Sequence, residues 1–206
     1  MFSSLPPVTR SLIIACVVVW FAEWQLGDVL TVYLGLWPVG SGEFEPWQIV
    51  TYAFLHEQDG VTHLLFNMFA LYMFGRDLER LWGSQRFLNL YLASVITAAL
   101  AQLAFAAAVG AEPYPTIGAS GGIFGILLAF AMYFPRRTIL LLIPPIPMPA
   151  WLFVTLYGVI ELVLGVTGTQ QGVAHFAHLG GMLGGYLLIE YWRGKFPIKP
   201  RRRLMR

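Results

Sequence analysis

Long apolar runs separated by short polar connections set the pattern of this chain. Most of the runs reach the roughly 20 residues that a helix needs to cross about 30 Å of hydrocarbon. They predict an all-α, polytopic membrane protein, a bundle of six transmembrane helices that takes up nearly the whole chain as one domain, residues 1–206. The six runs are Ser11 to Leu36, Val61 to Trp82, Phe87 to Val109, Ala119 to Phe134, Pro149 to Val166 and Val173 to Tyr191.

The composition points the same way. Of 206 residues, 57% are hydrophobic and 12% are charged, whereas about a quarter of the residues in soluble proteins are charged. The first run is longer than the apolar region of a signal peptide, and no small-x-small cleavage site follows it. We therefore expect it to remain in the protein as a membrane span.

The basic residues indicate the orientation of the spans. They precede the first run, follow the sixth, or lie in the connections after the second and fourth runs, so all are on one side: Arg10, Arg76, Arg80, Arg86, Arg136, Arg137, Arg193, Lys195, Lys199, Arg201, Arg202, Arg203 and Arg206. The opposite connections carry only acids, namely Glu43, Glu45, Glu57, Asp59 and Glu112. The positive-inside rule then predicts that both termini are cytoplasmic.

The basic tail, Ile198 to Arg203, fits two interpretations. It suits the anionic inner leaflet, and it is equally the composition of a solvated chain end, which we favour. Membrane lipids are expected partners of the apolar spans. The sequence has no nucleotide-binding glycine pattern, and we expect no nucleic acid partner.

Polar side chains open three of the predicted spans. With a cytoplasmic amino terminus, the second, fourth and sixth spans all run inward, and their first turns carry His63 with Asn67, Ser120, and His178. These side chains therefore lie at one depth. Polar groups within a membrane are costly and mark functional sites by default. A serine at a helix start also has free backbone N–H groups and the positive end of the helix dipole beside it, which suits an oxyanion.

Small residues predict close approach of the fourth and sixth spans. Glycine rows let helix backbones touch in lipid. The rows are Gly118, Gly121, Gly122 and Gly125 in the fourth span and Gly181, Gly184 and Gly185 in the sixth.

Each polar residue also has a structural interpretation. Ser120 can cap its helix, which serine favours, and His178 can bond a neighbouring carbonyl. His63 and Asn67 can tie the second span to the adjoining loop. Glu161, inside the fifth run, either bonds within the bundle or faces water at the site; we favour the first and do not assign it to a catalytic triad.

A metal site is the remaining alternative. His175 and His178 are spaced i, i+3, as metal ligands can be, but no acidic or cysteine partner stands nearby in the sequence. We expect neither a metal nor an organic cofactor.

Three ordered motifs resemble those of the rhomboid family of intramembrane serine proteases. His63-Leu64-Leu65-Phe66-Asn67 is similar to the family's H-x-x-x-N, and Gly118-Ala119-Ser120-Gly121 to its G-x-S-G. Ala177-His178-Leu179-Gly180-Gly181, continuing to Gly185, is similar to A-H-x-x-G-x-x-x-G. The order and placement of the motifs make the chain look like a bacterial-type, six-helix member, in the inner (plasma) membrane of a bacterium.

The resemblance implies roles for these residues. Ser120 and His178 form a dyad without a carboxylate, and the Ser120 N–H, His63 and Asn67 form the oxyanion hole. Phe124 takes the place of a family aromatic, more often tyrosine, that packs on the catalytic imidazole.

The first loop is also covered by the resemblance. The loop runs from about Trp37 to Gly60, and the resemblance implies that it forms a partly membrane-embedded hairpin. Gln48 stands where many members have arginine.

These residues predict an intramembrane serine endopeptidase that cleaves single-span transmembrane proteins near the outer membrane face. Ser120 attacks the scissile carbonyl, and His178 moves the proton. One alternative is an inactive rhomboid-like protein that binds membrane clients, although both dyad residues are present. Another is a small channel or transporter that uses His63, Glu161 and His178, which leaves the Gly-x-Ser-Gly context without a purpose.

Overall fold

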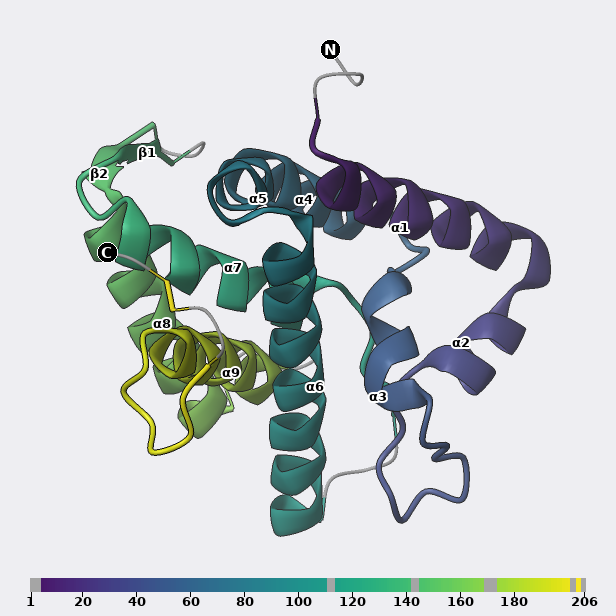
Figure 1. Cartoon of the computed structure of the whole chain (residues 1–206). Coiled ribbons are helices and arrows are strands. Elements are labelled where there is room, and N and C mark those ends of the chain that lie inside the picture. Colours follow the sequence, from purple (N-terminus) through teal and green to yellow (C-terminus); the bar gives the residue numbers. More distant parts are fainter. Residues whose placement is uncertain (1–4, 111–113, 142–144, 169–173, 201–202, 205–206) are drawn as a thin grey trace.

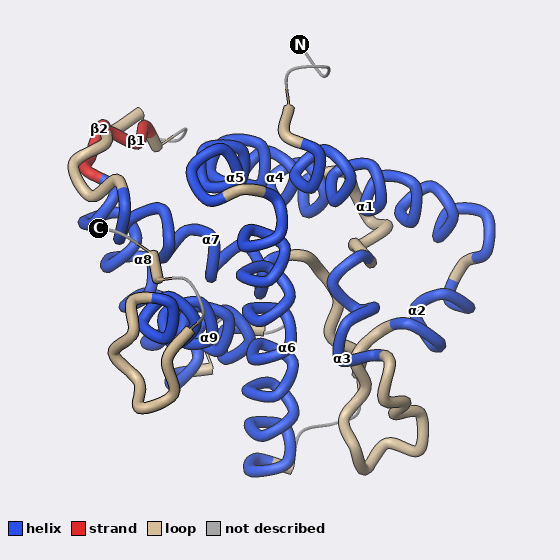
Figure 2. The backbone as a smooth tube through the Cα atoms, in the orientation of Figure 1, coloured by secondary structure: helices blue, strands red, loops and turns tan. Residues whose placement is uncertain are grey.

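The computed structural model describes residues 5–110, 114–141, 145–168, 174–200 and 203–204. Most of these residues are helical, and a two-stranded hairpin is the sheet within them (Figure 2). Some residues used above lie outside the described ranges: Glu112, Val173, Arg201, Arg202 and Arg206. The helices are α1 (Pro7–Leu26), α2 (Asp28–Leu34), α3 (Gln48–Thr51), η2 (Tyr52–Phe54), α4 (Thr62–Ala70), the π-helical turn η3 (Leu71–Gly75), α5 (Arg76–Trp82), α6 (Ser84–Val109), α7 (Ser120–Tyr133), α8 (Ala150–Thr167) and α9 (His175–Trp192).

The helices agree with the predicted runs except at the first. Among the described residues, α1, α6 and α8 are long and apolar enough to cross a membrane by length and composition, so the chain is an integral membrane protein. The prediction of one span from Ser11 to Leu36 was wrong. The helix breaks at Gly27, whose φ of 57° and ψ of −144° are open to glycine and strained for other residues, and α2 follows as a separate helix.

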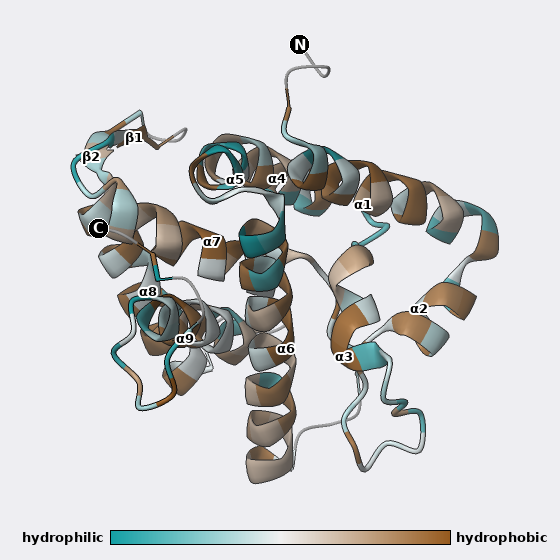
Figure 3. Ribbon diagram, in the orientation of Figure 1, coloured by the Kyte–Doolittle hydropathy of each residue, from teal (hydrophilic) through white to brown (hydrophobic). Residues whose placement is uncertain are grey.

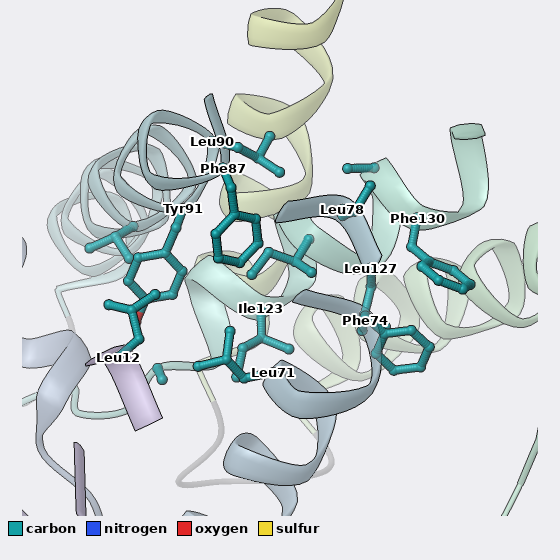
Figure 4. Packing of buried hydrophobic residues seen from close by; sticks show 14 of the residues in the cluster. Leu12, Leu71, Phe74, Leu78, Phe87, Leu90, Tyr91, Ile123, Leu127 and Phe130 are labelled. Carbon is teal, nitrogen blue, oxygen red and sulfur yellow. The ribbon is translucent and has the colours of Figure 1, made fainter. Parts of the chain in front are cut away.

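Helix α6 stands at the centre of the fold. In Figure 1 it runs between α7, α8 and α9 on one side and α1, α2 and α3 on the other. Figure 4 shows the apolar side chains packed where α1, η3, α5, α6 and α7 meet, with Phe87, Tyr91 and Ile123 among them. Many large apolar residues of the helices are exposed, and Figure 3 colours much of the helical ribbon as hydrophobic, which suits contact with lipid.

Contacts between distant segments bring several helix ends together at one end of the bundle. The Thr9 N–H at the start of α1 donates to a Glu79 carboxylate oxygen at 2.7 Å. Arg137, after α7, pairs with Asp77 of α5 at 2.8 Å. Near these ends the aromatic rings of Trp82, Tyr133 and Trp192 are in contact. The start of α1 and the carboxyl-terminal ends of α5, α7 and α9 therefore lie at the same end of the helix bundle. The hairpin of β1 (Thr138–Leu140) and β2 (Pro147–Pro149), antiparallel with Ile139 opposite Met148, follows α7.

Gln48 organises the first loop. It is fully buried, and its amide nitrogen donates to the Glu43 carbonyl at 2.9 Å, while its amide oxygen accepts the Trp37 N–H at 3.3 Å. The neighbouring Trp47 indole donates to the Tyr33 carbonyl at 2.9 Å. Hydrogen bonds across the loop are thus made by glutamine where the family resemblance suggested arginine.

Candidate active site

Ser120 and His178 are in direct contact although 58 residues separate them. Ser120 is the first residue of α7 and His178 lies in the first turn of α9. The Ser120 Oγ is 2.8 Å from the His178 Nε2. The helix cap before α7 is Ala119, with no side-chain capping bond, so the interpretation of Ser120 as a capping residue was wrong. The serine hydroxyl is instead paired with an imidazole nitrogen.

Glycines allow α7 and α9 to approach this closely. A Cβ atom on Gly181 would collide with the backbone of Gly121, and one on Gly185 would lie 3.1 Å from the Gly125 Cα. These four glycines form the contact between the two helices. The predicted rows also pack on α6. Cβ atoms on three of the α7 glycines and on one of α9 would meet α6 side chains first, namely Gly121 against Ala98, Gly122 against Tyr91, Gly125 against Ser94 and Gly184 against Thr97.

Phe124 fixes the plane of the histidine ring. One turn after Ser120, it stacks on His178 with ring centroids 4.2 Å apart and an angle of 6° between the planes. Both side chains are buried. Tyr157 of α8 also stacks on Phe124, with ring centroids 5.3 Å apart. The imidazole is therefore held by aromatic packing on α7 and α8 as well as by its hydrogen bonds.

His63 of α4 lies beside Gly118, in the turn that precedes Ser120 and α7. Gly118 differs from the prediction because it precedes α7 instead of lying within it, and its φ of 124° is a conformation that favours glycine. A Cβ on Gly118 would lie 2.9 Å from the His63 Nε2 and 3.8 Å from the Ser120 Oγ. Helix α4 and the start of α7 thus approach each other at Gly118, which leaves room for the His63 imidazole.

Asn67 is buried one turn after His63. Its side-chain nitrogen donates to the His63 carbonyl oxygen at 2.8 Å within α4. An amide nitrogen carries two protons, so one N–H is left for another acceptor.

His56 adds a neutral ring beside His63. Their ring centroids are 5.1 Å apart, and His56 lies in the connection before α4. Burial, with a contribution from the nearby His63, lowers the pKa of His56 to about 4. It is therefore uncharged at neutral pH.

Glu161 changes the predicted picture of the site. Its Oε2 lies 2.9 Å from the His178 Nδ1 and 2.6 Å from the His175 Nδ1. The expectation that Glu161 bonds within the bundle is therefore confirmed. The expectations that no acidic partner stands near the two histidines, and that Ser120 and His178 pair with no carboxylate beside them, are wrong for this chain. The sequence signals were a carboxylate inside an apolar run and the i, i+3 histidine pair; folding joins them across 14 and 17 residues.

The same three residues, Glu161, His175 and His178, are of the types that bind metal ions. Within the part of the chain that the structure describes, Glu161, His175 and His178 form the one such group, with one ligand atom from each lying within 4.8 Å of the others. Glu161, however, already bonds both Nδ1 atoms, and the other His178 nitrogen bonds the serine. Among the described residues, the remaining ring nitrogen of the group, the buried His175 Nε2, has no hydrogen-bond partner.

Comparison with known proteins identifies similar sequences. The Rhomboid domain matches residues 43–194. The chain is 34% identical over 150 residues to the Rhomboid protease GluP of Bacillus subtilis, covering 72% of this chain and 26% of that protein. It is 35% identical over 151 residues to Rhomboid protein 1, mitochondrial, of Saccharomyces cerevisiae, covering 68% and 40%. It is 28% identical over 199 residues to the Rhomboid protease GlpG of Serratia proteamaculans, covering 92% and 64%. The matches thus span from about a quarter to under two thirds of these relatives.

Proposed function

Because the chain belongs to the rhomboid family, we propose that it is an intramembrane serine endopeptidase that cleaves single-span transmembrane proteins near the outer membrane face. The observation that carries the proposal is the 2.8 Å contact between the Ser120 Oγ and the His178 Nε2 at the start of α7. Acyl transfer uses a nucleophile within hydrogen-bond reach of a base, and the free N–H groups of a helix start can bind the oxyanion that forms. Relatives named as rhomboid proteases support it.

The proposed reaction uses groups already in place. As the Ser120 oxygen bonds the scissile carbonyl carbon, its proton passes to the His178 Nε2 and the carbonyl electrons move onto oxygen. His178 then gives the proton to the amine nitrogen as the C–N bond breaks, and water hydrolyses the acyl-enzyme by the same route. The Ser120 N–H, His63 and Asn67 are proposed as oxyanion donors.

The proposed topology has six spans in one domain, residues 1–206, with both termini cytoplasmic in a bacterial inner membrane. The helix ends joined by Thr9–Glu79 and Arg137–Asp77 support a common cytoplasmic face for the basic connections. The site lies toward the opposite ends of α7 and α9. Substrates are proposed to enter between α4 and α8, which expose apolar side chains such as Phe66 and Leu162.

A labelling and cleavage experiment tests the function. The purified protein is placed in liposomes with a single-span fusion substrate whose membrane segment carries helix-weakening residues, because a helical carbonyl is shielded by its hydrogen bond. A fluorophosphonate probe should label one serine, mapped to Ser120 by mass spectrometry, and the substrate should be cut near its outer end. Substrate binding without labelling or cleavage would indicate a client-binding protein, and solute flux without either would indicate a channel or transporter.

Asn67→Ala is predicted to lower kcat with little change in KM or thermal stability. Loss of one oxyanion donor typically costs about 10² to 10³ in kcat, and Asn67 has one amide N–H not used by its bond to His63. Cleavage rates over a range of substrate concentrations, together with a melting curve, measure this. If the melting temperature falls while kcat of the folded protein stays near wild type, Asn67 has only a structural role.

Chelators are predicted to leave cleavage unchanged. Glu161 already bonds the Nδ1 atoms of His175 and His178, and the proposed reaction takes its nucleophile from serine, not from a metal-bound water. Initial rates are measured after incubation with EDTA and with 1,10-phenanthroline. Activity that is lost and then restored by zinc would contradict the proposed chemistry.

A further inference from the structure

Helix α8 buries a carboxylate while exposing most of its apolar side chains. Its buried residues are Ala150, Val154 and Glu161. The neighbours Ile160 and Leu162 are 48% and 49% exposed, whereas Glu161 is 6% exposed. Burying a carboxylate is costly unless it is paired and hydrogen-bonded. The burial of Glu161 is therefore explained by its hydrogen-bond partners.

Those partners form a continuous series that ends at the nucleophile. Glu161 Oε2 lies between the His175 Nδ1 at 2.6 Å and the His178 Nδ1 at 2.9 Å, and the His178 Nε2 continues to the Ser120 Oγ at 2.8 Å. Three helices, α7, α8 and α9, supply the four side chains. The carboxylate thus acts on the serine only through His178.

The chemistry of these atoms determines which His178 nitrogen carries the proton. An ionised carboxylate only accepts hydrogen bonds, so the Nδ1 atom of each histidine must be the donor. A neutral imidazole has one N–H, so the His178 Nε2 is left with its lone pair facing the Ser120 hydroxyl. This is the tautomer that can take the serine proton.

We propose that Glu161 is a positioning residue for peptide hydrolysis, holding His178 in the Nδ1–H tautomer and stabilising the imidazolium that forms when Ser120 loses its proton. This inference rests on the proposed protease function. The proton goes from the Ser120 oxygen to the His178 Nε2 and then to the leaving amine; Glu161 stays ionised throughout and takes no proton. His175 holds the same carboxylate oxygen from the other side.

Glu161→Gln tests this role because it keeps size and an acceptor oxygen but removes the charge. Cleavage of the single-span fusion substrate should show kcat reduced about 10²-fold or more, the lower range of general acid–base effects, with KM nearly unchanged. The rate constant of fluorophosphonate labelling should fall with kcat, since both depend on activation of Ser120. A residue that only tied α8 to α9 would alter the melting temperature and leave these rates unchanged in the folded protein.

Glu190→Gln is the matched control. Glu190 is also buried, lies on the same helix as His178, and bonds Arg193 and Lys195 at the other helix end. Its loss should change the melting temperature without changing kcat. Glu161→Met, an apolar side chain of similar size, is the second variant if Glu161→Gln does not fold. It should show the same loss of kcat.

The outcomes separate this inference from the function on which it rests. Wild-type protein that does not cleave, or Ser120→Ala that does, overturns the protease function. If wild type cleaves and Ser120→Ala does not, wild-type kcat in either Glu161 variant overturns the positioning role alone. A loss of activity that accompanies loss of the folded protein in both Glu161 variants assigns Glu161 to the fold and also overturns it.

Discussion

Ser120→Ala is expected to abolish cleavage of a single-span substrate and to abolish fluorophosphonate labelling. The Ser120 Oγ is the atom paired with the His178 Nε2, and alanine leaves the base with no hydroxyl to deprotonate. Removing the nucleophile of a serine protease costs up to about 10⁶ in kcat, so the residual rate should lie near background. Initial cleavage rates in liposomes measure the loss.

The fold should survive this substitution. Ser120 is not the capping residue of α7, so alanine removes no capping bond. Ser94→Ala is the control: Ser94 is fully buried in α6 against Gly125, and its hydroxyl has no hydrogen-bond partner among the described residues. This variant should cleave at the wild-type rate. Retained turnover in Ser120→Ala would show that another group is the nucleophile.

The sequence predicted much of the fold because lipid restricts the choices. A backbone in hydrocarbon must satisfy its own hydrogen bonds, so an apolar run of sufficient length becomes a helix. The run from Pro149 to Val166 is observed as Ala150–Thr167, and the run from Ala119 to Phe134 as Ser120–Tyr133. The glycine spacing likewise predicted that α7 and α9 touch, since Gly181 and Gly185 of α9 lie against Gly121 and Gly125 of α7.

What the sequence did not predict depends on tertiary contacts. Apolar residues resume after Gly27 and Asp28, so the prediction joined α1 to α2 in one run, while the backbone of one glycine separates them. Gln48 was noted as standing where many members have arginine, but its hydrogen bonds to the backbone of Glu43 and Trp37 depend on how the loop folds. Glu161 was recognised as an intramembrane carboxylate, but its partners are set by how α8 packs on α9, which no local pattern records.

His178→Ala and His175→Ala are expected to have very different effects on activity. His178 contacts the Ser120 Oγ, whereas the described hydrogen bond of the His175 ring is to Glu161. His178→Ala removes the base and should abolish both cleavage and fluorophosphonate labelling. His175→Ala removes only the second donor to Glu161 and should lower kcat modestly, by about tenfold or less. One charge-assisted hydrogen bond contributes roughly 1.5 to 3 kcal/mol at most, and this one acts on Ser120 only through two other side chains, Glu161 and His178.

The two histidine variants serve as stability controls for each other. Both histidines are buried, with 4% and 8% exposure, both lie in the first turn of α9, and both bond the same carboxylate oxygen, so each substitution removes a similar buried imidazole. Similar melting temperatures with unequal rates would therefore trace the difference to the contact with Ser120. The opposite ranking, with His175→Ala inactive and His178→Ala active, would mean that the base is His175 and that the serine must be reached by a rearranged α9.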